Sequence, residues 1–176
     1  MALDEVLFRR VRDGLSPPLI RLYNWDGPAI TVGYGQNPEE IVHIARCREA
    51  GVPVIRRITG GRAVFHDSEP GFTFIGPVAD PHLGGNIRES YRRVLELIEQ
   101  ALKALGLNDI NIGPVQKSAA RRKSAACFTS PTRFELMRRG RKITACAQYR
   151  AGGFVIHQGV VCFEAGAGRI GEFLRN

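Results

Sequence analysis

The order of its helical and strand-like segments constrains what this chain can fold into more than any other feature of the sequence. Three segments space their apolar residues as amphipathic helices do, at 2–14, 37–51 and 86–106. The longest of them is opened by Asn86 and closed by Gly106. Between and after these segments lie short stretches in which apolar and polar residues alternate, as in half-buried strands. This order predicts an α/β or α+β fold, in which a mixed, largely antiparallel sheet is flanked by helices.

Turn signals between the strand segments predict how the strands connect. The strands at 19–25 and 29–35 are separated by Asp-Gly-Pro, and we expect them to form a hairpin. The strands at 52–58 and 62–67 are joined by Thr59-Gly60-Gly61, which we expect to be the tip of a second hairpin, because glycine supplies positive φ at such a tip. Five further strand segments follow, at 71–78, 110–113, 133–140, 141–150 and 153–163.

The composition fits one globular domain with a substantial core. The chain has 176 residues, of which 44% are hydrophobic, and this leaves little room for two domains. No apolar run approaches the roughly 20 residues that a membrane span needs. The N-terminus lacks the long apolar region of a signal peptide. We therefore expect a cytoplasmic protein with no membrane partner.

The four cysteines argue against a structural metal and against a disulfide framework. No two of them form a C-x-x-C pair, and no histidine is interleaved at zinc-ligand spacing. We therefore expect no metal site. Cys47 and Cys162 are predicted to be small buried hydrophobic residues.

The charge of the chain is positive and clustered. The formal net charge is +8, and much of the excess lies at 117–124 and 138–142. Such a surface attracts anionic partners, although a solvated loop face explains a charge run equally well. Stacking on single-stranded nucleic acid would require aromatic residues interleaved with Arg121, Arg122 and Lys123, and the sequence has none there, which argues against nucleic acid as a partner.

Two stretches carry residues that suggest chemistry. In 56–67, two glycines flanked by arginines would let the backbone approach an anionic ligand. Cys127 follows a basic loop, and positive neighbours favour the reactive thiolate. Lys142 begins a strand of small apolar residues, which would suit a half-buried lysine, although a lysine after a turn is usually solvated. A thiolate and an ammonium that face one acyl carbonyl would make an acyl-transfer site.

Two histidines lie in the strand segments. His66 ends the strand after the glycine pair, and His157 lies within the last alternating segment. A histidine at such a position is more often a packed, hydrogen-bonded residue than a catalyst. Both interpretations stay open for each of them.

Several stretches, taken together and in order, resemble a known family. They are MALDEVL, RLYNWDGPAITVGYGQ, RRITGGRAVFHD, CFTSPTRFELMRRGRKITACAQYR and GFVIHQG. This combination resembles the lipoate–protein ligase A and octanoyltransferase family, closest to its cysteine-dependent octanoyltransferase branch. The resemblance covers nearly the whole chain and implies the biotin/lipoyl protein ligase-like fold. It also implies that 1–176 is a single catalytic domain without the C-terminal accessory domain of adenylating ligases.

The resemblance implies roles for particular residues. Cys127 would be the acyl-accepting nucleophile, and Lys142 would contact the acyl carbonyl. The family's arginine–glycine loop would line the acyl pocket. Two departures from the family pattern are Cys146, which brings a second thiol near the site, and Gln158, which stands where a histidine is usual. The candidate substrate-binding residues are Arg56, Arg57, Thr59, Gly60, Gly61, Ala63, His66, Ala145, Gln148 and His157.

The implied activity is transfer of an octanoyl or lipoyl group from acyl carrier protein, through a thioester on Cys127, to a lysine of a lipoyl domain. That domain would belong to a dehydrogenase E2 or to the glycine cleavage H protein, and no cofactor would be needed.

Two alternatives to this activity stay open. One is the catalytic subunit of a lipoate–protein ligase, which adenylates lipoate with ATP and magnesium, with or without a partner chain. The other is a non-catalytic relic that binds an acyl or nucleotide ligand. An acyl-adenylate needs a closed, water-poor site, so a domain without the accessory part favours the thioester.

Overall fold

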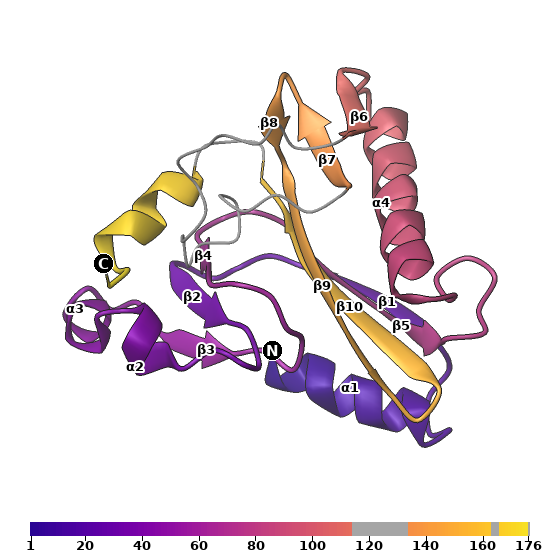
Figure 1. Ribbon diagram of the computed structural model, residues 1–176, viewed down its shortest axis with the longest axis horizontal. Coiled ribbons are helices and arrows are strands. Elements are labelled where there is room, and N and C mark those ends of the chain that lie inside the picture. The colour runs from indigo at the N-terminus through magenta and orange to yellow at the C-terminus, as the bar shows by residue number, and fades with distance from the viewer. Residues whose placement is uncertain (114–133, 163–165, 176) are drawn as a thin grey trace.

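The computed structural model describes residues 1–113, 134–162 and 166–175, whose strands form three sheets (Figure 1). The four-stranded sheet contains, in spatial order, β1 (Leu19–Tyr23), β5 (Gly71–Pro77), β10 (Phe154–Val161) and β9 (Thr144–Ala151). The second sheet contains β3 (Val54–Arg56), β2 (Ala29–Val32) and β4 (Val64–His66). The third contains β6 (Ile110–Gly113), β7 (Glu135–Arg138) and β8 (Arg141–Lys142). Of the described strand pairs, β2 and β3 run parallel and the others antiparallel, so the predicted class is confirmed.

Helices cover both faces of the four-stranded sheet. On one face lies α4 (Ile87–Ala104), whose apolar stripe packs on Phe72 and Phe74 of β5. On the other face α1 (Ala2–Arg12) packs against Ile75 and Ile156. The central strand β5 is therefore buried on both sides, which explains why nearly all of its residues are inaccessible.

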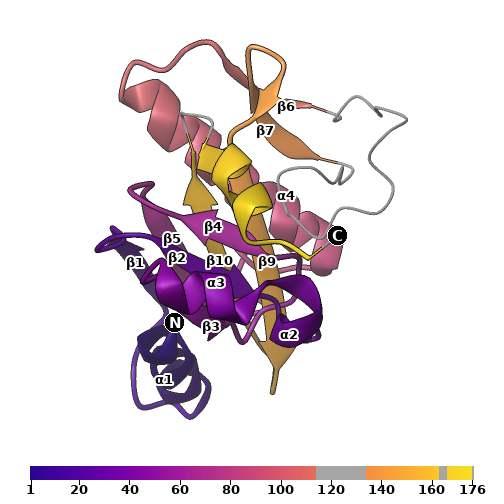
Figure 2. The ribbon, with the colours of Figure 1, turned by 90° about the vertical axis from the view of Figure 1, so that its left-hand side faces the viewer.

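A second core lies on the outer side of the β3-β2-β4 sheet. Two short helices, α2 (Pro38–Ile41) and α3 (Ile44–Glu49), and the 3₁₀ helix η2 (Gly166–Glu172) gather on that side, away from β9 and β10 (Figure 2). Cys47 is buried in this core, as predicted. Cys162 is only half-buried and packs at the edge of a smaller cluster.

Both predicted hairpins are wrong. β1 pairs with β5, whereas β2 pairs with β3 and β4, so the Asp-Gly-Pro turn leads from one sheet into another. β3 and β4 do not pair with each other, because β2 lies between them. Every residue of β2 is buried, and a strand in that position needs a neighbour on each edge to satisfy its backbone groups. The Gly60–Gly61 segment is therefore a loop that passes the end of β2 and not a hairpin tip.

The helix expected over 37–51 is interrupted. Val42 between α2 and α3 has extended backbone and forms a bridge with Leu174. The amide of His43 donates to Phe173 O at 2.8 Å, and the amide of Arg175 donates to Ile41 O at 2.9 Å. Pairing with a distant segment has thus replaced helical hydrogen bonds at this point, and it buries Val42 completely. None of the helices in the described ranges is long and apolar enough to cross a membrane.

Candidate functional site

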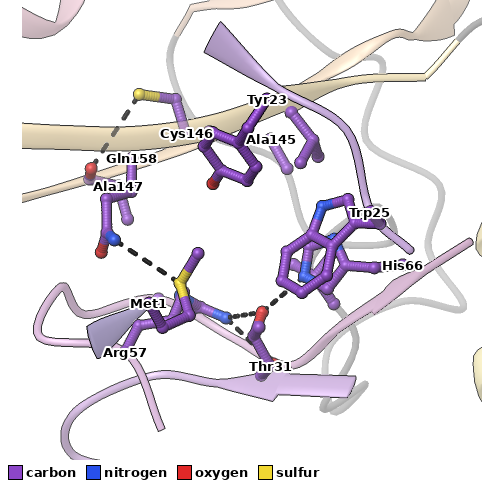
Figure 3. Close-up of a pocket in the computed structure, with 14 residues that line it drawn as sticks. Met1, Tyr23, Trp25, Thr31, Arg57, His66, Ala145, Cys146, Ala147 and Gln158 are labelled. Atoms are coloured by element: carbon purple, nitrogen blue, oxygen red, sulfur yellow. Dashed lines mark hydrogen bonds between the residues drawn. The ribbon is translucent and has the colours of Figure 1, made fainter. Parts of the chain in front are cut away.

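A pocket lies where the four-stranded sheet meets the β3-β2-β4 sheet (Figure 3). β9 and β10 contribute one wall, formed by Ala145, Cys146, Ala147, Gln158, Gly159 and Val160. The second sheet and its loop contribute the opposite wall, formed by Thr31, Arg57, Gly61, Val64 and His66. The N-terminus and the end of β1 close the pocket with Met1, Tyr23 and Trp25. Most of these side chains are apolar, and the polar ones gather around Arg57.

The Arg57 side chain fastens the arginine–glycine loop to β2. Its Nη1 donates to Thr31 O at 2.9 Å and to Thr31 Oγ1 at 2.6 Å. Its Nη2 donates to Gly60 O and to Arg62 O, each at 3.0 Å. Arg57 is only 8% exposed, so the loop wraps a buried cation whose hydrogen bonds fix its shape. The wall thereby gains a fixed positive charge.

A polar chain continues from Arg57 through Thr31 to His66. Thr31 Oγ1 lies 2.7 Å from His66 Nε2, and His66 Nδ1 lies 2.6 Å from Glu69 Oε1. Arginine can only donate, so the Thr31 hydroxyl accepts a hydrogen bond from Arg57. It then donates its own hydrogen bond to His66 Nε2. We assign the remaining His66 proton to Nδ1, where it is donated to the Glu69 carboxylate.

Electrostatics agree with a neutral His66. Burial lowers the pKa of His66, and the contact with Glu69 only partly opposes this. Burial raises the pKa of Glu69, but hydrogen bonds from His66 and from the Asp67 amide outweigh it and leave that pKa below its usual value. The Trp25 ring stacks on His66 with ring centroids 3.8 Å apart. His66 is therefore held rigidly as a neutral ring in the pocket wall.

Four of the predicted substrate-binding residues line this pocket: Arg57, Gly61, His66 and Ala145. Three others support the loop without lining it. Thr59 is fully buried behind the wall, Gly60 accepts a bond from Arg57, and Ala63 belongs to the second core.

The other three predicted residues lie elsewhere. Arg56 is exposed and its Nη1 donates to Tyr34 O at 2.7 Å and to Gln36 O at 2.6 Å. Gln148 lies on the α4 side of β9, where its Nε2 donates to Ile87 O at 2.9 Å. His157 is fully buried, with Nε2 placed 2.6 Å from Ser90 Oγ of α4. On β9 and β10 successive side chains alternate between the pocket and α4, which separates Gln148 and His157 from the pocket-facing Ala147 and Gln158.

The two predicted catalytic residues are not brought together by the described part of the chain. Cys127 and the basic segment of Arg121, Arg122 and Lys123 lie outside the described residues. Lys142 lies on β8, where its almost buried ammonium donates to Glu135 Oε1 at 2.8 Å. It is not among the pocket-lining residues.

Among the pocket residues that were not predicted from the sequence are Met1, Tyr23, Trp25 and Thr31. Tyr23 and Trp25 share one side of a strand segment by their two-residue spacing, and Thr31 is a polar residue in the apolar run of β2. Burial raises the pKa of Tyr23 to about 12, so this phenol stays protonated. The sequence thus marks each of these residues, but only the packing of the two sheets brings them together in one site.

None of the described His, Cys, Asp and Glu side chains form a group of three or more that could hold a metal ion.

Two packed sheets that enclose a mostly apolar pocket beside a buried arginine define the class to which this domain belongs, a small α/β domain with a binding pocket between its sheets. The family model described as "Lipoyl protein ligase A/B catalytic domain" matches residues 1–176. The chain belongs to that family, which confirms the resemblance seen in the sequence.

Several curated relatives share the name octanoyltransferase LipM. The chain is similar to octanoyltransferase LipM of Moorella thermoacetica, with 35% identity over 167 residues that cover 92% of this chain and 59% of the relative. It is also similar to octanoyltransferase LipM of Carboxydothermus hydrogenoformans, with 33% identity over 175 residues that cover 99% of this chain and 64% of the relative. The chain thus spans less than two thirds of the length of these relatives.

Solved structures share the fold. A Thermoplasma acidophilum protein with bound lipoic acid superposes with a TM-score of 0.74 at 24% identity, over 98% of this chain and 65% of that one. Lipoate-protein ligase A bound with ATP gives a TM-score of 0.74 at 23% identity, over 99% and 65% of the two chains. These likenesses confirm the lipoate-ligase-type fold of the catalytic domain.

Proposed function

We propose that the protein transfers an octanoyl group to a lysine of a lipoyl domain. The observation that carries this proposal is the pocket itself, which combines a mostly apolar wall with one polar end at Arg57, Thr31 and His66. A saturated acyl chain is stabilised by apolar burial, and its carbonyl group needs polar partners. The relatives named octanoyltransferase support the choice of acyl group.

In the proposed reaction, Cys127 carries the acyl group. Its thiolate attacks the thioester carbonyl of octanoyl acyl carrier protein, a new thioester forms, and the carrier's sulfur leaves as thiolate. The neutral ε-amine of the acceptor lysine then attacks the Cys127 thioester. An amide forms, the Cys127 sulfur leaves as thiolate, and the nitrogen loses one proton. This route needs neither ATP nor magnesium.

Lys142 is proposed to stabilise the oxyanion in both steps. Its ammonium is held at 2.8 Å by the fully buried Glu135 carboxylate. A charged group that is already fixed in place needs little reorganisation when negative charge develops on the carbonyl oxygen. In this proposal Glu135 holds the Lys142 ammonium in place, and Cys127 brings the carbonyl to it.

The test is intact-protein mass spectrometry after incubation with octanoyl acyl carrier protein, with and without ATP. We expect an octanoyl adduct that survives acid and is removed by hydroxylamine. Cys127→Ala should abolish the adduct and the subsequent transfer to a lipoyl domain. Cys162→Ala, which removes a half-buried thiol that does not line the pocket, is the matched control and should keep both.

Two results would contradict the proposal. Full transfer by Cys127→Ala would exclude the thioester on that residue. ATP-dependent attachment of lipoate that survives Cys127→Ala would identify the protein as an adenylating ligase instead.

A further inference from the structure

A chain of buried hydrogen bonds connects the first helix to the arginine–glycine loop. Asp4 of α1 is completely buried, and its Oδ1 accepts from Arg21 Nη1 at 2.7 Å. Its Oδ2 accepts from Gln158 Nε2 at 2.7 Å. Gln158 Oε1 in turn accepts from Thr59 Oγ1 at 3.0 Å. The chain therefore joins α1, β1, β10 and the arginine–glycine loop at the pocket wall.

The direction of every bond in this chain follows from Asp4. An ionised carboxylate can only accept hydrogen bonds, so Gln158 must turn its NH₂ group toward Asp4. The amide oxygen of Gln158 is then left to face the loop, where it accepts the Thr59 hydroxyl proton. A charge on α1 thus sets the orientation of an amide that itself lines the pocket.

Thr59 is the point at which this chain holds the loop. Its carbonyl oxygen accepts from the Tyr34 amide at 2.9 Å, and its hydroxyl is bound to Gln158. Arg57 holds the same loop from the β2 side through Gly60 O and Arg62 O. Between these two attachments lies Gly61, which faces Ala147 across the pocket wall with room for little more than a methyl group. The loop is therefore fixed from both sheets.

Packing alone does not account for a carboxylate at position 4. Helix α1 is already anchored by Phe8 and Val11 in an apolar cluster. A buried charge is unfavourable unless it is paired and fully hydrogen-bonded, and Arg21, with a partly exposed side chain, supplies the pairing. An apolar residue would fill the space without that requirement, but it could not orient Gln158.

We propose that Asp4 is a positioning residue, which through Gln158 and Thr59 holds the 57–62 loop in the geometry that binds the acyl group; this inference rests on the proposed function. Asp4 does not line the pocket and acts only through the two residues between it and the loop. The 57–62 loop also carries Arg57, so its displacement would weaken contacts at the polar end of the pocket.

The experiment compares Asp4→Asn, Gln158→Glu and the double variant in octanoyl transfer from acyl carrier protein. Asp4→Asn should raise KM for the acyl donor by about tenfold with a smaller change in kcat, because it disturbs binding geometry. Gln158→Glu sets two carboxyl groups against each other, so one must hold a proton, and its activity should fall as the pH rises.

The double variant is the decisive comparison. Asn at position 4 can donate to Glu at position 158, which can still accept the Thr59 proton, so every donor again meets an acceptor. We expect KM to return to within about threefold of the wild-type value. The matched control is Asp109→Asn, which removes a carboxylate paired with Arg138 and Arg139 far from this chain of bonds and should leave KM unchanged.

Hydrogen exchange of the Tyr34 amide, which donates to Thr59 O of the loop, separates this inference from the proposed function. Faster exchange there in Asp4→Asn, with unchanged exchange in the α4 core, supports the positioning role. This holds even if the wild-type protein transfers no octanoyl group, because that result would overturn only the proposed function. Unchanged exchange of the Tyr34 amide in a folded Asp4→Asn protein would overturn the inference. A double variant no better than the single ones would overturn it as well.

Discussion

His157 shows how the surroundings of a residue set its protonation state. Ser90 Oγ donates its proton to Leu83 O and therefore accepts from His157 Nε2–H. The other ring nitrogen, Nδ1, is buried and has no hydrogen-bond partner among the residues that the structure describes. Burial lowers the pKa of His157 to about 4, and the positive charge of Arg150 contributes. The ring is thus kept neutral in the packing between β10 and α4.

This low pKa makes a prediction about stability and pH. The unfolded chain takes up a proton at His157 near its ordinary pKa of about 6.5, whereas the folded protein does so only near 4. The free energy of unfolding should therefore fall as the pH is lowered from about 6.5 to about 4, by roughly 3 kcal/mol from this residue. Urea unfolding at several pH values across this range measures the effect.

The control is His157→Gln, whose amide can still donate to Ser90 but does not titrate. Its unfolding free energy should depend less on pH than that of the wild-type protein. His66, whose pKa is also lowered by burial, accounts for part of the dependence that remains. Parallel curves for the two proteins would show that His157 does not titrate as described.

At the scale of elements, the close approach of β2 to the arginine–glycine loop depends on Gly33. A Cβ atom at this position would lie 2.1 Å from Gly61 O, which belongs to the backbone and cannot turn aside. Gly33→Ala should therefore push the loop outward. We expect a loss of about 1–3 kcal/mol in the free energy of unfolding, together with weaker binding of the octanoyl donor.

A nearby glycine provides the comparison. Gly35 is exposed, and a Cβ atom there would meet no heavy atom within 4 Å. Gly35→Ala should leave stability and donor binding near their wild-type values. Equal effects of the two substitutions on urea unfolding would mean that the approach of Gly33 to Gly61 is not what constrains the loop.

The same elements show what sequence patterns reveal and what they leave open. The α4 helix was predictable because its signals are local: Asn86 and Glu89 form a capping box, and Gly106 adopts positive φ after the last turn. The partners of β2 were not predictable, because alternation identifies a strand without naming its neighbours. The short turns favoured hairpins. However, β2 is the central strand of its sheet and needs a partner on each edge, and both partners come from farther along the chain.

The pocket follows the same rule. Arg57, Gly61 and His66 could be singled out because they lie in one contiguous motif. Tyr23 and Thr31 could not, since they become neighbours only when the two sheets pack together. The chain of bonds from Asp4 to Thr59 is harder still, because a buried aspartate at the start of an amphipathic helix looks like an ordinary first-turn acid.

At the scale of the whole molecule, the net charge of +8 bears on the proposed partners. A strongly basic protein attracts an acidic one over long distances and raises the rate of their encounter. We expect the proposed partners, acyl carrier protein and lipoyl domains, to be acidic. Described basic side chains include the exposed Arg46 and Arg48 on α3 and Arg88 and Arg92 on α4, so the charge is spread over more than one face.

The rate of acylation by octanoyl acyl carrier protein should therefore depend on salt. Raising the ionic strength from about 0.05 M to about 0.5 M shortens the screening length severalfold and should lower kcat/KM for the carrier by about tenfold. An uncharged octanoyl thioester of N-acetylcysteamine has no long-range attraction to lose, so its rate should change little over the same range. Stopped reactions analysed by mass spectrometry measure both rates. If the two donors respond equally to salt, the effect lies in the enzyme's own chemistry or folding, and the net charge has no part in bringing the carrier to it.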